Sequence, residues 1–552
     1  MKKNPFHLSV CAIFLGALLI GSVPVFAAGS SLYINTASNA VSAALSSLYA
    51  ISGTGDTALL PGNKAYAMTA TGLQEVNSTA ATPTPRPTID DDGSAYKDDT
   101  IPYSTLKVGL YSGSGALTEA RLENAVGSGY QFGYFDSNRD FHAVGSTTET
   151  QLTMIADKNT TLSSGKTVGC YHILRSGSYG SFADAKAAAD AIGGFPAYYS
   201  GKYYVLYGDY ENASAASEAI AATGISGEPY SASSRCMVVT ETRTGKILFE
   251  FDYGSTYSLA IQPISTSGKA VTWFKGYKYY GSFQYARLTD NEKITVVNFV
   301  NIDDYVKGVL PYEMNGNFPV EALKAQALCA RTYAASHFNS RRQYGFDIYA
   351  DTWDQVYKGL NSASSATNAA ADATAGQYIW YQGHLCETYF FSSSGGATES
   401  CLNVWGTELP YLQGVVDPYD SETSHTYDQW SYTLTAAQIQ SKLNSKFSKC
   451  NLGTIASATP TYSDTGNCIS ITFTDTSGNS YTISRTNCYY GLDLPSLHFT
   501  IEQNSSGDFV INGGGWGHNC GLSQWGAYAM AKNHNMTASQ IIKFYYTGVY
   551  VR

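Results

Sequence analysis

A run of small residues from 319 to 334 constrains the fold more than any other segment of the chain. Pro319 suits the first position of a helix, where its missing N–H has no partner to lose, and Glu321 places a favourable charge in the first turn. Two faces of this helix carry small or apolar side chains: Val320, Leu323, Ala327, Ala330 and Ala334 on one, and Ala322, Ala325 and Cys329 on the other. A helix that is apolar on every side is buried. We therefore predict a largely buried, alanine-rich helix.

Polar side chains in and before this helix are the first candidates for function. Gln326 and Arg331 lie within it, and a buried polar group needs a partner or a ligand. Glu313 precedes the helix in an aromatic neighbourhood, with Tyr312 and Phe318 close in sequence. Poor solvation there would raise the pKa of its carboxyl towards the working pH of a general acid. On these residues alone, a surface carboxylate beside the helix explains Glu313 equally well.

Composition narrows the classes of partner. The 552 residues include 34 Lys and Arg against 44 Asp and Glu, which gives a net charge of −10. That balance argues against binding to nucleic acid or to an anionic membrane. Only 14% of the residues are charged, whereas 44 are tyrosine and 52 are glycine. Such a surface suits polar, ring-shaped ligands such as glycans, although an ordinary extracellular β-rich protein has the same composition.

The N-terminus has the pattern of a secretory signal. Lys2 and Lys3 precede an apolar run over residues 8–20, and small residues follow as far as Ala27 and Ala28. A positive region, an apolar region and a small-residue cleavage site in this order direct export. We expect cleavage after Ala27 or Ala28 and a secreted or cell-wall location. The alternative is a retained N-terminal membrane anchor, because the apolar run nearly reaches the length that spans a bilayer.

The cysteines show no metal-binding or redox spacing. Of the ten cysteines, Cys11 lies in the signal, and the other nine contain no C-x-x-C pair. A zinc ribbon or a thioredoxin-like motif is therefore not indicated. Export permits disulfides, and two candidate pairs each bracket an expected strand–turn–strand unit. These pairs are Cys386 with Cys401 and Cys468 with Cys488.

Composition and periodicity divide the chain into five segments. The signal at 1–27 is followed by a low-complexity segment and linker at 28–101, which ends in a proline-rich and then acidic stretch. A β-rich segment at 102–165 comes next, and then a repeat at 166–226. The last segment, 227–552, begins with alternating β-type runs and contains the buried helix.

The segment at 166–226 contains one strand–loop–helix pattern twice. Gly177-Ser178-Tyr179 precedes an expected helix at 183–189, and Gly208-Asp209-Tyr210 precedes another at 213–220. The expected strands are 170–174, 196–200 and 203–207. The pattern resembles a SPOR-like domain, a small βαββαβ module, and this resemblance implies binding to glycan strands stripped of their stem peptides. A plain α+β insertion explains the pattern equally well.

Several blocks in a fixed order resemble the SpoIID/LytB family. The blocks are Glu313-Met314 and residues 322–327, 330–334, 355–359, 391–399, 404–405, 515–527 and 544–548. Their order along the chain, more than any single block, carries the resemblance. The sequence departs from the family pattern at Asn519-Cys520, where members usually have Gly-Val or a similar pair.

The resemblance implies an α+β fold with a β-rich catalytic region, and an exported peptidoglycan lytic transglycosylase of the sporulation type. It implies that Glu313 is the catalytic acid, which cleaves the MurNAc–GlcNAc bond of peptide-free strands and leaves a 1,6-anhydroMurNAc end. A cell-wall amidase that removes the peptides is the implied collaborator. The LytB side of the family implies an alternative, a non-catalytic amidase enhancer that binds the wall.

The remaining blocks supply further site candidates. The candidate substrate-binding residues are Gln326, Arg331, Gln355, Ser393, Ser394, His518 and Gln524. Ser393 and Ser394, followed by two glycines, either bind a sugar or form a simple hairpin turn. His518, in a glycine-rich loop, either contacts substrate or braces the site. Arg331 and Gln326 are better suited to bracing the loop that carries Glu313 than to touching substrate.

We expect no metal and no cofactor. Some members of the family bind zinc through a Cys/His cluster after the equivalent helix. Residues 335–360 contain His337 but no cysteine, so this stretch cannot supply four tetrahedral ligands.

Overall fold

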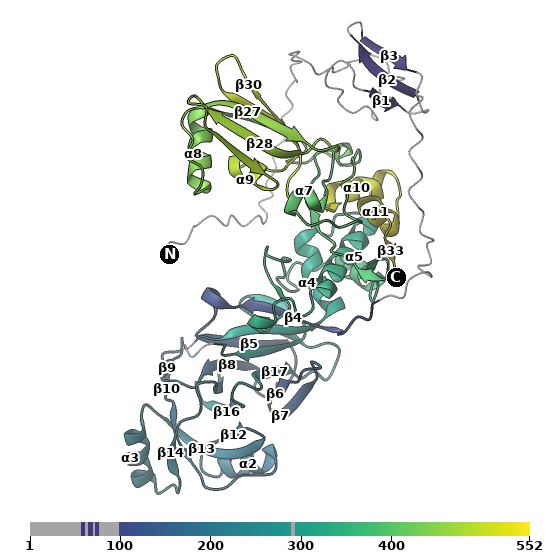
Figure 1. Ribbon diagram of the computed structural model, residues 1–552. Coiled ribbons are helices and arrows are strands. Elements are labelled where there is room, and N and C mark those ends of the chain that lie inside the picture. The colour runs from purple at the N-terminus through teal and green to yellow at the C-terminus, as the bar shows by residue number, and fades with distance from the viewer. Residues whose placement is uncertain (1–56, 61–63, 70–71, 77–98, 289–292) are drawn as a thin grey trace, which may run out of the picture. The chain divides into compact units, whose positions relative to one another are not determined.

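The computed structural model describes residues 57–60, 64–69, 72–76, 99–288 and 293–552 (Figure 1). The chain divides into two compact units, 1–89 and 90–552. In the first unit, β1 (Thr57–Leu60), β2 (Lys64–Thr69) and β3 (Gly72–Val76) form an antiparallel sheet in that order. This sheet lies within the segment predicted as low-complexity and linker. The predicted secretory signal lies outside the described residues.

Two large sheets dominate the second unit. One contains β5 (Glu119–Val126), β8 (Gln151–Ala156), β11 (Tyr171–Leu174), β12 (Phe195–Tyr199), β13 (Lys202–Tyr210), β14 (Glu228–Tyr230), β15 (Met237–Glu241), β16 (Ile247–Asp252), β18 (Val271–Phe274) and β19 (Tyr277–Tyr279). The other contains β4 (Thr105–Tyr111), β6 (Tyr130–Phe135), β7 (Phe141–Thr147), β17 (Leu259–Pro263), β20 (Ser282–Ala286), β21 (Thr295–Asn301) and β22 (Ile348–Tyr349).

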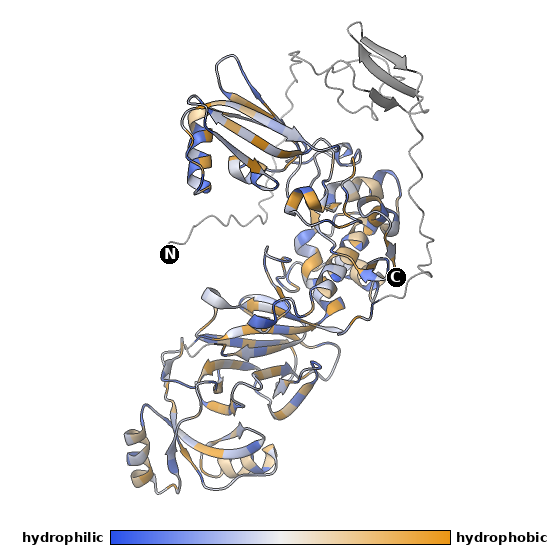
Figure 2. Cartoon of the chain, in the orientation of Figure 1, coloured by the Kyte–Doolittle hydropathy of each residue, from blue (hydrophilic) through white to orange (hydrophobic). Residues whose placement is uncertain are grey.

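The two sheets share one apolar core. Their strand orders are β14-β11-β13-β12-β16-β15-β8-β5-β18-β19 and β22-β4-β21-β20-β17-β6-β7. Phe132 of the seven-stranded sheet stacks on Phe249 of the ten-stranded sheet, with ring centroids 4.9 Å apart. Hydrophobic and hydrophilic residues alternate along many of these strands (Figure 2), as expected where one face of a strand is buried. A short hairpin of β9 (Thr160–Thr161) and β10 (Thr167–Val168) lies between β8 and β11 in the chain.

The segment predicted as a repeat has the element order βαββαβ. Its helices are α2 (Phe182–Asp190) and α3 (Ala213–Thr223), and its strands are β11, β12, β13 and β14. Ser181 and Asn212 accept hydrogen bonds from backbone N–H groups in the first turns of the two helices, which is why the helices begin there. The strands are not separate from the rest of the unit, because β12 pairs in parallel with β16. The ten-stranded sheet therefore runs through this segment into its neighbours.

The predicted buried helix is confirmed as α5 (Val320–Ser336), in which 13 of 17 residues are buried. Pro319 is its N-cap rather than its first helical residue. Four helices surround α5. They are α4 (Ile302–Glu313), α6 (Ser365–Ala373), α10 (Gln524–Asn533) and α11 (Ala538–Tyr545). The mixture of helix and sheet agrees with the predicted α+β class.

Smaller elements complete the second unit. The sheets are β24-β23-β33, β25-β32, β26-β31-β30 and β27-β28-β29. Their strands are β23 (Ile379–Tyr381), β24 (His384–Leu385), β25 (Phe390–Phe391), β26 (Trp430–Leu434), β27 (Ile455–Tyr462), β28 (Cys468–Asp475), β29 (Ser480–Ser484), β30 (Phe499–Gln503), β31 (Phe509–Gly513), β32 (Leu522–Ser523) and β33 (Tyr550–Val551). The remaining α-helices are α7 (Cys401–Trp405), α8 (Ala436–Lys446) and α9 (Asn487–Leu492). Within the described ranges, no helix is both long and apolar enough to cross a lipid bilayer.

A buried ion pair joins the β6–β7 turn to the chain just before β22. Arg139 contacts both carboxylate oxygens of Asp347, at 2.6 and 3.0 Å, and both side chains are at most 2% exposed. The Arg139 guanidinium also lies over the ring of Tyr103, 3.7 Å from its centroid. Removing one member of such a pair leaves the other charge buried and uncompensated.

We expect Asp347→Asn to lower the free energy of unfolding by about 3–5 kcal/mol, because Arg139 then loses its counter-charge at nearly unchanged volume. Thermal denaturation of the full chain measures this. Lys186→Ala is the control, since its pair with Asp190 is half exposed on both sides and contributes about 0.5 kcal/mol or less. Equal effects of the two substitutions would contradict the role assigned to the buried pair.

Candidate active site

Glu313 is the last residue of α4 and is half-buried. Burial raises the pKa of its carboxyl to about 7, despite a hydrogen bond that favours ionisation. That bond is donated by the backbone N–H of Val356 to Oε1, at 3.0 Å. Among the described residues, no other group donates a hydrogen bond to this carboxyl. Glu313 can therefore hold a proton near neutral pH and retains free hydrogen-bonding capacity for a ligand.

The segment that touches Glu313 is held tightly against α4. A Cβ on Gly308 of α4 would lie 2.4 Å from the ring of Tyr357, so only glycine permits this approach. Tyr305 of α4 donates a hydrogen bond to the side-chain oxygen of Gln355, at 2.8 Å. Gln355 is buried, and its amide nitrogen has no partner among the described residues. These contacts place the Val356 N–H beside Glu313.

Arg331, on α5, links this helix to α4, which carries Glu313, and to α6. It is fully buried on α5, and its Nε donates to Asp303 of α4 at 2.7 Å. Its other nitrogens donate to the backbone carbonyl of Ala371 at 3.0 Å and to the hydroxyl of Thr374 at 3.2 Å, at the end of α6. Asp304, the second carboxylate of the first turn, pairs with Lys269 at 2.6 Å. Both carboxylates near the start of α4 are therefore engaged in ion pairs.

Ser393 and Ser394 are fully buried, and their hydroxyls point to carboxylates inside the protein. The hydroxyl of Ser393 donates to Asp420 at 2.8 Å, and that of Ser394 donates to Asp417 at 3.0 Å. Ser523 also donates to Asp420, at 2.7 Å. The two serines thus hold their glycine-rich loop in place. The sequence analysis did not identify Asp417 and Asp420, which lie between its motif blocks.

The two buried aspartates have opposite protonation preferences. Burial and the adjacent Asp420 raise the pKa of Asp417 to about 7. Burial also opposes ionisation of Asp420, but hydrogen bonds from His425, Ser523 and the Ser393–Ser394 turn outweigh it and lower its pKa. Below about pH 7 the pair therefore carries one negative charge, on Asp420.

Two glycine-rich segments meet at this loop. Gly395 has φ of 67°, and a Cβ there would lie 2.2 Å from the backbone of Gly514. Asn519 has φ of 61°, a conformation that Asn tolerates better than most residues. Its side-chain amide donates to the carbonyl oxygens of Ser394 and Ala397, at 2.9 and 3.2 Å. The Asn that departs from the family pattern thus links the two loops directly.

His518 is half-buried within a group of aromatic rings. Its ring centroid lies 4.9 Å from that of Trp405 and 5.3 Å from that of Phe391. Burial lowers its pKa to about 4, so the imidazole is neutral. Nδ1 accepts the N–H of Cys520 at 3.1 Å, which leaves Nε2 to donate to the carbonyl of Phe390 at 3.1 Å. Both ring nitrogens are therefore used within the protein.

Of the predicted site residues, one group lies near Glu313 and another lies around Asp420. Gln355 lies beside the segment that contacts Glu313. Gln524 of α10 donates to Gln326 of α5 at 3.5 Å, and the residue before it, Ser523, joins the Asp420 network. The structure adds Trp353, whose side chain is 70% exposed only three residues before Val356. An exposed tryptophan so close in sequence to Val356, which contacts the candidate acid, offers an apolar surface to a ligand.

One of the two predicted cysteine pairs is present in the structure, and the other is not. The thiol of Cys468 is hydrogen-bonded to that of Cys488, as in one candidate pair. Cys401 is instead hydrogen-bonded to Cys520, next to His518, and not to Cys386. The structure contains no disulfide among the nine cysteines of the described part of the chain.

The helices that carry Glu313 provide no cluster of metal ligands. Within the described ranges, His, Cys, Asp and Glu side chains gather closely enough to hold a metal ion at one place, formed by Asp157, His172 and Glu250. That place lies on the ten-stranded sheet.

The family model and the similar proteins point to the same family. A family model described as stage II sporulation protein matches residues 290–381. The chain is 38% identical over 276 residues to an uncharacterised protein of Brachyspira hyodysenteriae, across 50% of this chain and 72% of the relative. It is 32% identical over 273 residues to stage II sporulation protein D of Bacillus subtilis, across 46% and 75%. It is 27% identical over 348 residues to an amidase enhancer of the same bacterium, across 54% and 47%.

The raised pKa of Glu313 has a consequence for stability. Below about pH 4.5 the carboxyl is protonated in both the folded and unfolded chain, and above about pH 7 it is charged in both. Folding therefore loses stability as the pH rises between these values, because the charged form is held in a poorly solvated place. We expect Glu313→Gln to be more stable than the wild type by up to about 3 kcal/mol at pH 8, and by little at pH 4.5.

Thermal denaturation at both pH values measures this difference. Glu321→Gln is the matched control, with the opposite sign. Burial opposes ionisation of Glu321, but its contact with Lys324 prevails and lowers its pKa. The control variant should thus be less stable than the wild type at pH 8. A Glu313→Gln variant that is also destabilised at pH 8 would show that the carboxyl is well solvated.

Proposed function

The chain belongs to the stage II sporulation protein D family, and on this premise we propose that it is a lytic transglycosylase acting on peptidoglycan. The single observation that carries the proposal is Glu313, whose pKa is raised to about 7 by burial and which accepts one hydrogen bond, from Val356, among the residues that the structure describes. A general acid works best when its pKa lies near the working pH. Glu313 can deliver a proton and take one back.

The reaction needs one carboxyl. Glu313 donates its proton to the oxygen between MurNAc and GlcNAc as positive charge develops at C1 of MurNAc. The C6 hydroxyl of the same MurNAc then attacks C1 and gives its proton to the carboxylate. The C1–O bond to GlcNAc breaks, a C1–O6 bond forms, and Glu313 is protonated again. No second carboxylate is required, in keeping with the ion pairs that occupy Asp303 and Asp304.

The other predicted residues support this site in different ways. Arg331, Ser393 and Ser394 fix the positions of α4 and of the glycine-rich loop through buried hydrogen bonds. His518 braces the adjacent aromatic group. Gln326, Gln355 and Gln524 are buried, so they position the elements around the site rather than contact a sugar. We assign substrate contact to the exposed Trp353.

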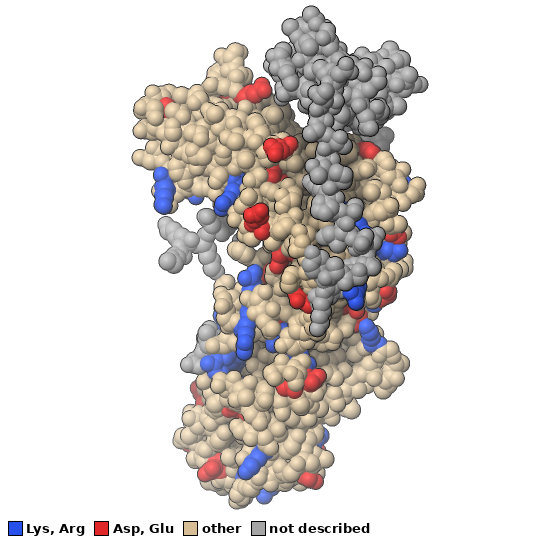
Figure 3. Space-filling view, turned by 45° about the vertical axis from the view of Figure 1, so that its right-hand side comes forward, with Lys and Arg blue, Asp and Glu red and all other residues tan. Residues whose placement is uncertain are grey.

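We further propose that residues 166–226 bind glycan strands from which the stem peptides have been removed. Their βαββαβ order and half-buried tyrosines on β13 support this assignment. Charged side chains are sparse over the face shown in Figure 3, and both signs are interspersed. The expected setting is the cell wall after export, during sporulation, with an amidase that supplies peptide-free strands.

A second candidate function follows from the likeness to an amidase enhancer. In that case the chain would bind the wall without cleaving it, and Glu313 would serve no chemical purpose. The two functions differ in the sugar ends that the chain produces and in their sensitivity to Glu313.

We expect the chain to convert peptide-free glycan strands into products with 1,6-anhydroMurNAc ends, detected by mass spectrometry. Glu313→Gln should slow this cleavage by about 10²–10⁴-fold, because general acid catalysis is lost, and should still sediment with the strands. Glu321→Gln, which removes a nearby carboxylate, should cleave normally. Free reducing ends would mean hydrolysis instead, and intact strands that bind the wild type would favour the amidase enhancer.

We expect Trp353→Ala to weaken binding of glycan strands about tenfold, equivalent to ~1.4 kcal/mol, because a sugar ring loses its apolar platform beside Glu313. The effect should appear in KM, with kcat changed less. Tyr490→Ala is the matched control, since Tyr490 is 52% exposed on α9. Equal KM values for Trp353→Ala and the wild type would remove Trp353 from the binding surface.

A further inference from the structure

Three side chains with metal-binding atoms converge inside the ten-stranded sheet. His172 lies on β11, Glu250 lies on β16, and Asp157 directly follows β8. One ligand atom from each lies within 4.8 Å of the others. His172 Nε2 is 3.5 Å from Asp157 Oδ1 and 3.8 Å from Glu250 Oε2, and the three side chains are at most 1% exposed.

The atoms that face one another have no hydrogen-bond partner. Distances of 3.5 and 3.8 Å are too long for hydrogen bonds. Among the described residues, both carboxylate oxygens of Asp157, Nε2 of His172 and Oε2 of Glu250 are buried and unpartnered. Buried charged oxygens without partners are strongly destabilising. A cation placed among these atoms would satisfy all of them together.

The polar atoms of His172 and Glu250 that point away from the cluster have hydrogen-bond partners. Nδ1 of His172 donates to the backbone carbonyl of Gly208, at 2.7 Å. In the neutral imidazole, the form that binds a metal ion, this bond leaves the lone pair on Nε2, facing the cluster. The thiol of Cys236 donates to Oε1 of Glu250, at 3.1 Å. Metal-binding histidines and carboxylates are usually oriented by outer hydrogen bonds of this kind.

Geometry and charge both fit a divalent ion. Zn²⁺ bound tetrahedrally at about 2.0–2.1 Å places neighbouring ligand atoms about 3.3–3.4 Å apart. The two separations from His172 Nε2, 3.5 and 3.8 Å, need to close by only a few tenths of an ångström. Two carboxylates and a neutral imidazole carry two negative charges, which a divalent ion neutralises. The hydroxyl of Tyr199, also buried and unpartnered among the described residues, is available to a water in the fourth position.

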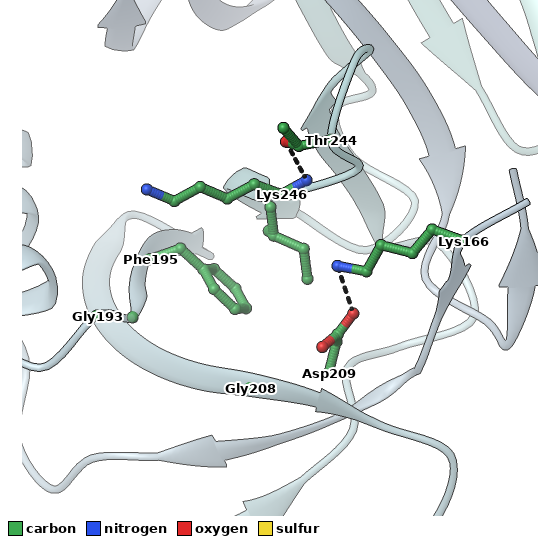
Figure 4. A pocket seen from close by; sticks show the side chains of 9 residues that line it. Lys166, Gly193, Phe195, Gly208, Asp209, Thr244 and Lys246 are labelled. Atoms are coloured by element: carbon green, nitrogen blue, oxygen red, sulfur yellow. Dashed lines mark hydrogen bonds and ion pairs between the residues drawn. The ribbon is translucent and has the colours of Figure 1, made fainter. Parts of the chain in front are cut away.

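A surface hollow adjoins the cluster (Figure 4). Gly208 and Phe195, which both contact His172, also line this hollow. The ring of Phe195 meets that of His172 edge to face, with centroids 5.2 Å apart. Lys166 and Asp209 form an ion pair at 3.1 Å in the same hollow. The cluster is thus buried but close to the surface.

We propose that Asp157, His172 and Glu250 bind one structural divalent metal ion, for which Zn²⁺ is the best fit. His172 belongs to the βαββαβ segment, whereas Asp157 and Glu250 belong to the strands beside it, so the ion links the two. The sequence analysis expected no metal. It could not detect this site because the ligands are spread from position 157 to 250 without a recognisable spacing.

The test is the zinc content of the purified full chain. Mass spectrometry of the metals in wild-type protein, stripped with a chelator and dialysed against Zn²⁺, should show about one ion per chain more than in His172→Ala. His142→Ala is the matched control, because His142 is a surface imidazole with a side chain 47% exposed, and it should keep the ion. Added Zn²⁺ should raise the Tm of the stripped wild type but not that of His172→Ala.

A second set of variants separates metal binding from folding. Cys236→Ala should weaken zinc affinity about 10–100-fold by removing the outer hydrogen bond, and Cys236→Ser should restore most of it because its hydroxyl also donates. Glu250→Gln, nearly unchanged in shape, should lose the ion. A natively folded wild type that binds no more Zn²⁺ than His172→Ala or Glu250→Gln, with no change in Tm, would overturn the proposal and identify a proton-sharing cluster.

Discussion

The position of Glu313 depends on one partly buried ion pair, between the buried Arg331 of α5 and Asp303 of α4. Arg331 is the largest fully buried side chain of the described residues, and its charge would be strongly destabilising without Asp303 at 2.7 Å. Because α4 is a continuous helix that ends at Glu313, anchoring its first turn to α5 determines where its last residue lies. The alanines of α5 let the surrounding helices approach closely, whereas the ion pair determines how α4 is placed against them.

Burial around the candidate site favours uncharged forms. It raises the pKa of Glu313 and Asp417 to about 7 and lowers that of His518 to about 4. The three groups differ in their hydrogen bonds. Asp417 and His518 are bonded within the protein, whereas Glu313 accepts a single bond from Val356. A shifted pKa alone does not identify a catalytic group, but a shifted pKa together with unused hydrogen-bonding capacity supports the proposal that Glu313 is the catalytic acid.

In the large sheets, as around Glu313, buried polar groups need a hydrogen-bond partner or an opposite charge. The βαββαβ segment continues into the sheet through the pairing of β12 with β16, and polar side chains meet close to that junction. Such groups destabilise an apolar core when they are unbalanced, but they provide a specific link when a counter-charge is present. The proposed ion and the Arg331–Asp303 pair would therefore act alike, since each joins elements that are distant in the sequence.

The sequence by itself determined the features that depend on neighbouring residues. These include the buried helix α5, the βαββαβ order of the repeat and the aromatic setting of Glu313, because periodicity and local composition encode them. It also selected Ser393 and Ser394, but not the direction of their hydroxyls. Only the tertiary structure decided that they point to Asp420 and Asp417, that Cys401 meets Cys520, and that His172 meets Glu250. Contacts of this kind arise when sheets and helices pack together, and no local pattern in the chain records them.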